Sequence, residues 1–172
     1  MTELLHAARD GNQHALDAFV RATEPDVRGL CRHLGDPETV DDLVQDTYCR
    51  ALRAMPRVRG DGNGRGWILS IARHTCIDAT RSRIRWRRRR DHRELPEAPV
   101  EDHDHTTVDD LLARLGPNRR EAFVLTQMLG CSYADAADII GCPVGTVRSR
   151  VARAREDLLD IVTDVDDTGT GS

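Results

Sequence analysis

Apolar residues recur along this chain at the three- and four-residue spacing of amphipathic helices, and two-residue alternation is not sustained anywhere. Half-buried strands need that alternation, so the pattern predicts an all-α fold. The clearest helix is expected to begin at Asp36-Pro37, a capping residue followed by proline, and to end at Pro56. Its predicted buried stripe is Val40, Leu43, Val44, Thr47, Ala51 and Leu52.

The same spacing predicts helices on both sides of this one. Residues 2–10 and about 12–34 are expected to form one or two helices, with Pro25 near a break or in a first turn. The segment RVRGDGNGRG, with four glycines in ten residues, predicts a loop, and a helix is expected from about Gly66 through WILSIARHTCIDATRSRIRWRRRR. Later helices are predicted over 108–115, from an Asn118 cap to Gly130, over 132–141, and from Pro143 to about Val162.

Charge divides the 172-residue chain into blocks. All 25 basic residues are arginine, and the net charge is −6 over 1–46, +11 over 47–90, −7 over 91–110, zero over 111–140, +4 over 141–155 and −6 over 156–172. Residues 91–108 hold two prolines and many acids, which predicts an acidic flexible linker. We therefore expect two small helical domains, 1–90 and 109–162, and a disordered tail over 163–172.

The second basic block has the layout of a helix-turn-helix. A short helix with small residues at Ala136 and Ala137 is followed by Gly141, a turn, and a longer helix beginning at Pro143. The expected core side of the longer helix carries Val144, Val147, Val151, Ala154 and Leu158. Its other side offers hydroxyl and guanidinium groups without a carboxylate: Thr146, Arg148, Ser149, Arg150, Arg153 and Arg155. Such a face suits the major groove of DNA, although arginines on an exposed helix can also serve only solubility.

Two motif blocks carry a resemblance to a known family. The segment LGCSYADAADIIGCPVGTVRSRVARARE resembles region four, and DDLVQDTYCRAL with WILSIARHTCIDATR resembles region two, of the extracytoplasmic-function (ECF, group IV) RNA polymerase sigma factors of the sigma-70 family. Order and spacing agree too, over about residues 5–160. Within the family the chain is most similar to the actinobacterial sigma-C type.

The resemblance implies a promoter-specificity subunit that binds core RNA polymerase at the clamp of the largest subunit and the flap of the second-largest subunit. The clamp would bind the face formed by Asp41, Asp42, Gln45 and Asp46, which composition alone interprets as an ordinary solvated helix face. The distal promoter element would be read by the face around Arg148, Ser149 and Arg153, with Ala152 replacing a commonly bulkier residue.

The resemblance also implies that the first domain reads and melts the proximal promoter element, binding double- and single-stranded DNA. The candidates are Arg59, Asn63, Arg65, Trp67, Arg73, His74, Asp78 and Arg81. His74 replaces a common asparagine, which puts the base preference in doubt, and Trp67 can be partly core. The arginines over 83–90 can track phosphate or form a solvated arm. Members of the family are commonly sequestered by an anti-sigma protein between the domains, and the linker permits such a partner.

Two other functions fit parts of the sequence. One is a free-standing helix-turn-helix repressor or activator that binds as a dimer, for which the chain shows no spare apolar face. The other is a thiol or metal sensor built from Cys31, His33, Cys131 and Cys142. The five cysteines, including Cys49 and Cys76, read more simply as small buried hydrophobic residues, and His103 and His105 as solvated.

No motif for catalysis or phosphate binding is found, so we expect no enzymatic activity, no cofactor, no metal and no small-molecule substrate. Apolar runs are too short to cross a membrane. The N-terminal MTELLHAARDGN lacks the basic start and apolar stretch of a signal peptide, which favours the cytoplasm.

Overall fold

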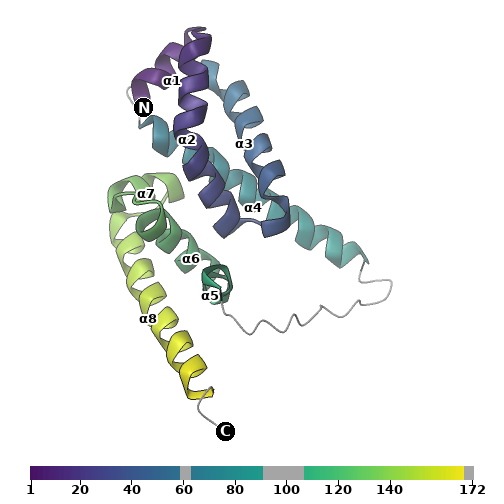
Figure 1. Ribbon diagram of the computed structural model, residues 1–172, viewed down its shortest axis with the longest axis vertical. Coiled ribbons are helices and arrows are strands. Elements are labelled where there is room, and N and C mark those ends of the chain that lie inside the picture. The colour runs from purple at the N-terminus through teal and green to yellow at the C-terminus, as the bar shows by residue number, and fades with distance from the viewer. Residues whose placement is uncertain (59–62, 91–106, 169–172) are drawn as a thin grey trace.

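Helices account for nearly all of the described residues in a computed structural model, which covers residues 1–58, 63–90 and 107–168. The elements are α1 (Thr2–Arg9), α2 (Gln13–Leu34), η1 (Pro37–Thr39), α3 (Val40–Ala54), η2 (Met55–Arg57), α4 (Gly64–Arg90), α5 (Val108–Arg114), α6 (Pro117–Phe123), η3 (Val124–Met128), α7 (Tyr133–Ile140) and α8 (Val144–Thr168). No strand occurs within these ranges, and the predicted all-α fold is confirmed. In Figure 1 the bundle α1–α4 lies above the bundle α5–α8.

The first bundle is held together by the apolar faces of α2, α3 and α4. Phe19, Val27 and Leu30 of α2 pack with Ile68 and Leu69 of α4, and each is 0–1% exposed. Burying a side chain of this size stabilises the fold by about 1.5–3 kcal/mol. The amphipathic spacing recognised in the sequence therefore places these helices against one another.

Two expectations for this bundle are wrong. Pro25 lies inside α2. Its ring is on the solvent side, and buried residues before and after it keep the helix continuous although proline lacks the backbone N–H for one helical hydrogen bond. Leu52 is 48% exposed, since it sits at the edge of the α3 stripe beside a shallow groove of about 250 Å³ between α2 and α3. The Asp36 cap is confirmed, although the first turn after it is a 3₁₀ helix.

Helix α4 is the longest element and runs beyond the bundle. It begins at Gly64, two residues earlier than predicted, because the Asn63 side chain accepts hydrogen bonds from the Arg65 and Gly66 backbone at 3.1 and 3.2 Å. Three residues of the predicted glycine loop, 64–66, therefore lie in α4, its first residue Arg57 lies in η2, and residues 59–62 lie outside the described ranges. The last buried residue of α4 is Cys76, and the helix then projects past α3 (Figure 1).

The second bundle begins with a capping box at Thr107, whose hydroxyl and backbone exchange hydrogen bonds with Asp110. Helix α6 starts from Gly116 with Pro117 in its first turn, so the predicted Asn118 cap is wrong. Proline presets the first helical turn and displaces the cap by two residues. The chain continues through the π-helical turn η3 to Gly130.

Helices α7 and α8 form the predicted helix-turn-helix. Ser132 caps α7 by accepting from the Asp135 backbone at 3.0 Å, and Gly141 ends it with φ +77°. Val147, Val151 and Ala154 of α8 are 0–1% exposed against the small residues of α7. Helix α8 extends to Thr168, so the tail predicted from 163 is helical over its first six residues. After Gly145 the sequence has no glycine or proline before Gly169.

Candidate nucleic-acid interface

The distal-element candidates occupy one open side of α8. Arg148, Ser149, Arg153 and Arg155 are exposed, while Thr146 and Arg150 are half-buried. The Ser149 hydroxyl donates to the Thr146 carbonyl at 3.0 Å, and the Arg148 guanidinium lies 5.9 Å from the centre of the Tyr133 ring. This contact with α7 orients Arg148 without covering its hydrogen-bond donors.

The outer arginines of this face are partly engaged with the protein. Arg155 donates to the Gln127 side chain at 2.6 Å, and Arg150 lies 3.8 Å from the Cys142 sulfur. A guanidinium has five donors, so each retains donors for a phosphate. Arg148 and Arg153 are consequently the candidates best placed to reach base edges, with Arg150 and Arg155 toward the flanks.

The proposed polymerase-binding face lies on α3. Asp42 and Gln45 are exposed, whereas Asp41 accepts from Arg28 at 2.6 Å and Asp46 from Arg50 at 3.0 Å. The hydrogen bonds that Arg28 donates to Asp41, and then to Glu24, raise the pKa of Arg28. The two neighbouring arginines reduce the net negative charge that the sequence alone assigns to this face.

The proximal-element candidates divide into two groups on α4. An outer stripe of His74, Asp78 and Arg81 is exposed to solvent. A ring nitrogen of His74 lies 2.7 Å from the Ser70 carbonyl, and Asp78 accepts from Arg50 at 2.7 Å. The hydrogen bond with Arg50 is the main reason that the pKa of Asp78 is lowered. Asp78 is therefore a charged, ion-paired neighbour of the stripe.

The inner group, Asn63, Arg65, Trp67 and Arg73, faces the second bundle. Arg73 forms an ion pair with Glu121 of α6, and the two side chains are 16% and 8% exposed. Trp67 is half-buried, with its ring centre 6.3 Å from that of Phe19, which confirms a partly core role. Arg59 lies outside the described residues.

Arg65 and Asn63 join the two bundles at the start of α4. Arg65 donates to Asp26 of α2 at 2.6 Å and to the Leu129 carbonyl at 2.5 Å. The Asn63 amide donates to Asp135 of α7 at 2.8 Å. The pKa of Arg65 is raised, chiefly by its hydrogen bond with Asp26. Together with the Arg73 pair, these contacts engage Arg65 and Arg73 at the interface, while Asn63 stays exposed.

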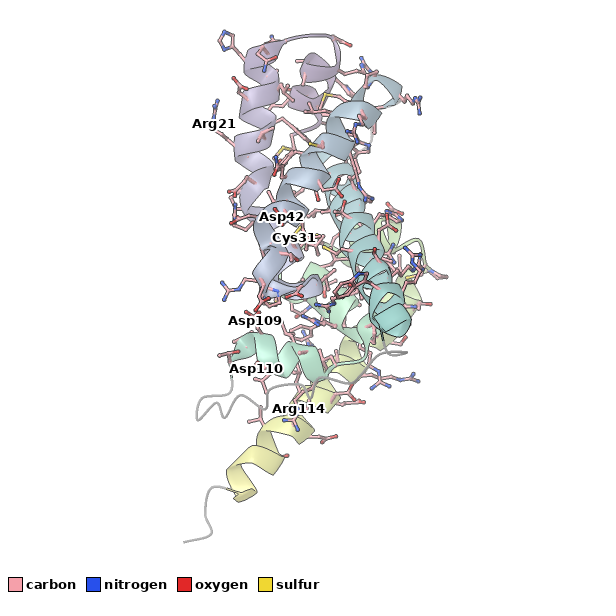
Figure 2. All side chains as sticks on the ribbon, turned by 90° about the vertical axis from the view of Figure 1, so that its right-hand side faces the viewer. Arg21, Cys31, Asp42, Asp109, Asp110 and Arg114 are labelled. Atoms are coloured by element: carbon pink, nitrogen blue, oxygen red, sulfur yellow. The ribbon has the colours of Figure 1, made fainter. Side chains whose placement is uncertain are left out.

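A further contact between the bundles joins α2 to α5. Asp109 lies 2.7 Å from a ring nitrogen of His33 and accepts from Arg32 at 3.0 Å, at the place where the labelled Asp109 meets the end of α2 in Figure 2. Burial acts to raise the pKa of Asp109, but the hydrogen bonds from Arg32 and His33 outweigh it and leave the pKa lowered. Contacts at both ends of the interface thus hold the bundles together.

The cysteine and histidine candidates for a sensor do not converge. Within the described ranges, no group of three or more histidine, cysteine or acidic side chains could hold a metal. Cys31, Cys76 and Cys131 are buried free thiols, as the hydrophobic interpretation predicts, but Cys142 is half-buried and Cys49 exposed. A hydrogen bond with Cys31, together with burial, raises the pKa of Cys76. His103 and His105 lie outside the described residues.

Comparison with known proteins decides the family. The family profile described as Sigma-70 region 2 matches residues 19–90, and Sigma-70, region 4 matches residues 105–158. The chain is 44% identical over 166 residues to the ECF RNA polymerase sigma factor SigC of Mycobacterium tuberculosis, covering 92% of this chain and 89% of that protein. The chain belongs to the ECF sigma factors. The same identity confirms its similarity to the sigma-C type.

Solved structures support the ECF assignment. The chain superposes on the sigma factor RpoE from Bartonella quintana, solved with the anti-sigma factor NepR, with a TM-score of 0.73, 27% identity, and coverage of 86% of this chain and 96% of that one. On CnrH, solved with the cytosolic domain of CnrY, the TM-score is 0.76 at 27% identity, covering 95% and 97%.

This ECF sigma factor binds core RNA polymerase and directs promoter-specific transcription initiation. The free-standing dimeric repressor is thereby excluded. None of the helices in the described part of the chain has the length and apolar character that a membrane span requires.

The interface between the bundles is the feature of this ECF sigma factor that sequence reasoning missed. Its acidic partners, Asp109, Glu121 and Asp135, were not among the predicted functional residues. Only Glu121 could have been suspected from the sequence as a buried, paired residue, because it is a charged residue beside the apolar residues of its helix. A single sequence cannot identify the arginine that pairs with it.

Proposed function

We propose that this sigma factor reads its promoter with two separate surfaces and docks on polymerase with a third. The α8 face reads the distal element in the major groove, mainly through Arg148, Ser149 and Arg153. The α4 candidates bind unstacked bases of the proximal element, and the exposed Asp42 and Gln45 centre the contact with the clamp. The domains responsible are 1–90 and 109–162, joined by 91–108.

The observation that carries this proposal is the open face of α8. It combines a helix-turn-helix frame, a recognition helix fixed by three buried residues, and exposed arginines. Arginine can donate two parallel hydrogen bonds to guanine, and other arginines can bind phosphates. Promoter opening then draws on binding energy, since bases held outside the stack no longer pair. The protein acts without enzymatic activity, in the cytoplasm.

Binding of the inner group to the proximal element requires the bundles to separate. Separation would release the donors that Arg65 and Arg73 direct at the Leu129 carbonyl and at Glu121. The 16 residues between Arg90 and Thr107 could span roughly 55 Å at about 3.4 Å per residue, enough for the bundles to occupy separate promoter elements. Polymerase and DNA phosphates would replace the contacts that are lost.

An anti-sigma protein is a further partner in this proposal, because the related RpoE was solved with one. In this chain, such a protein would have to compete for the same buried surfaces of α4 and α6. An anti-sigma protein that inserts between the bundles must therefore replace the Arg73 pair with contacts of its own.

The test is transcription in vitro with bacterial core polymerase and a library of genomic fragments. We expect the purified chain to bind core enzyme and to direct transcripts from a limited set of start sites. A chain that binds core but starts transcription at no defined site would contradict the promoter-reading assignment. A chain that fails to bind core would contradict the docking assignment.

A further inference from the structure

The last ten residues of α4 form a strongly cationic extension, here called the arginine arm (residues 81–90). Seven of the ten are arginine, and no acidic residue occurs between Asp78 and Asp91. Residues 81–86 are all exposed. The arm is helical although it follows the last buried residue of α4 by more than a turn, and Figure 1 shows it leaving the bundle.

The composition of the arm favours an anionic ligand. Arginines four apart on a helix repel one another, each pair costing about 0.2–0.5 kcal/mol. One anchor is visible at its base, where Arg83 pairs with Asp36. A phosphate backbone would supply the negative charge that the arm itself lacks.

Trp86 distinguishes the arm from a merely solvated charged helix. Its side chain is 55% exposed, although tryptophan is usually well buried, and it lies between Arg85 and Arg87 in the sequence. Solubility alone does not require an exposed indole. An aromatic ring within a cationic strip is the combination that binds single-stranded nucleic acid, by stacking on bases while arginines bind phosphates.

The arm is continuous with the outer stripe of the proximal-element candidates. His74, Asp78 and Arg81 are followed by Arg85 at helical spacing, so one face of α4 runs from the stripe onto the arm. From Arg81 to Trp86 the helix rises about 7.5 Å, roughly two steps of a stacked strand at about 3.4 Å each. Trp86 follows Arg85 and lies about 100° round the helix from it, so a strand leaving the stripe would reach Trp86 by crossing the arm, within a few nucleotides.

We propose that the arginine arm is a single-stranded DNA site, in which Trp86 stacks on a base of the displaced promoter strand and the adjacent arginines bind its phosphates. The proposal rests on the proposed function for the identity of the strand. Unlike Arg65 and Arg73, residues 81–86 of the arm are exposed while the bundles are in contact. It therefore makes the first contact with unpaired DNA, before the inner group is uncovered.

Intrinsic fluorescence tests the stacking directly because the chain has only two tryptophans. In a Trp67→Phe variant, Trp86 is the only source of indole emission. Titration with a 12-nucleotide oligothymidylate should quench this emission, and a duplex with the same number of phosphates should quench it much less. Trp86→Ala should weaken oligothymidylate binding about 5- to 100-fold, whereas Trp86→Phe should retain most of it.

Two controls separate stacking from general charge. Arg85→Ala should weaken oligothymidylate and duplex alike and reduce the salt dependence of both. If Trp67→Phe does not fold, the difference in quenching between the parent chain and Trp86→Ala gives the same information. Absence of quenching, or Trp86→Ala binding as tightly as the parent, would overturn the stacking site. Equal quenching by duplex would overturn its preference for a single strand.

The assay needs no polymerase, so its outcome is independent of the proposed function. Quenching with no directed transcription would leave the arm in place and contradict the promoter-reading role. If transcription is directed normally by the Trp86→Ala variant and no quenching is seen, only the single-stranded DNA site on the arm would be contradicted.

Discussion

Arg73 of α4 and Glu121 of α6 form an ion pair across the two bundles, and the Glu121 side chain is only 8% exposed. Arg73 is a candidate for binding the proximal element. Glu121 belongs to the bundle whose α8 carries the distal-element face. The pair therefore links the availability of a DNA-binding arginine to the distance between the bundles. Breaking it from the Glu121 side leaves Arg73 intact for DNA.

Replacing Glu121 by glutamine should favour separation of the bundles. The variant keeps the side-chain shape but removes the charge opposite Arg73, and losing one partner of a mostly buried pair costs about 1–3 kcal/mol. We expect a larger radius of gyration by small-angle scattering and tighter binding to single-stranded proximal-element DNA without polymerase. The exposed Glu156→Gln on α8 is the matched control and should change neither. Unchanged size and affinity in Glu121→Gln would mean that other contacts dominate the interface.

The Asp109 contact with Arg32 and His33 predicts a loss of stability in acid. The pKa of Asp109 is lowered in the folded chain, so the contact stabilises above the unfolded value of about 3.9 and is lost as pH falls through the folded value. Asp109→Asn should cost about 1 kcal/mol in urea unfolding at pH 6, and the difference from the parent should shrink toward pH 3. Asp160→Asn, at an exposed position of α8, serves as the control. A difference that stays constant with pH would assign the effect to packing.

Local sequence signals predicted the elements well where backbone chemistry decides them. Ser132 and Gly141 bound α7, and Asp36 caps the turn before α3, as their residue types indicate. Pro25 was misplaced because buried residues on both sides hold α2 together, which is a tertiary effect. Asn118 was misplaced because Gly116-Pro117 already provides a helix start.

The candidate site was predictable only in part, for a different physical reason. The exposed arginines of α8 follow from helical spacing, because the core side of that helix is unambiguous. Spacing does not show that Arg65 and Arg73 turn toward another bundle, since their partners there, the Leu129 carbonyl and Glu121, lie 64 and 48 residues away in the sequence. Long-range ion pairs of this kind leave no periodic signal in one chain.

Charge reversal on α3 should separate polymerase binding from folding. Asp42 is exposed, so Asp42→Arg should leave the helix intact and place a cation where the clamp is expected to bind; adding Asp46→Arg strengthens the effect. We expect core binding to be lost in pull-down with unchanged circular dichroism. Asp160→Arg on α8 is the charge-matched control. If core binding survives the double reversal, the α3 face is not the docking surface.

Truncating the recognition arginines should relax promoter choice. Arg148→Ala or Arg153→Ala removes a donor pair from the exposed α8 face and should cost about 1–3 kcal/mol in binding to the promoter fragment. Arg114→Ala, an exposed arginine on α5, should cost little. Binding to scrambled duplex provides the comparison. Equal weakening on promoter and scrambled DNA would assign these arginines to phosphate contact alone.

The turn of the helix-turn-helix can be tested with two glycines four residues apart. Gly141 has φ +77°, and a Cβ there would meet nothing within 4 Å, so Gly141→Ala introduces backbone strain without a clash. This should destabilise the second bundle by about 1–2 kcal/mol in urea unfolding. Gly145 has equal space but lies within α8, so Gly145→Ala should be neutral or stabilise by up to about 1 kcal/mol. Opposite signs at two equally open positions would attribute the role of Gly141 to its left-handed conformation, and a loss of similar size at both would point to a cause other than φ.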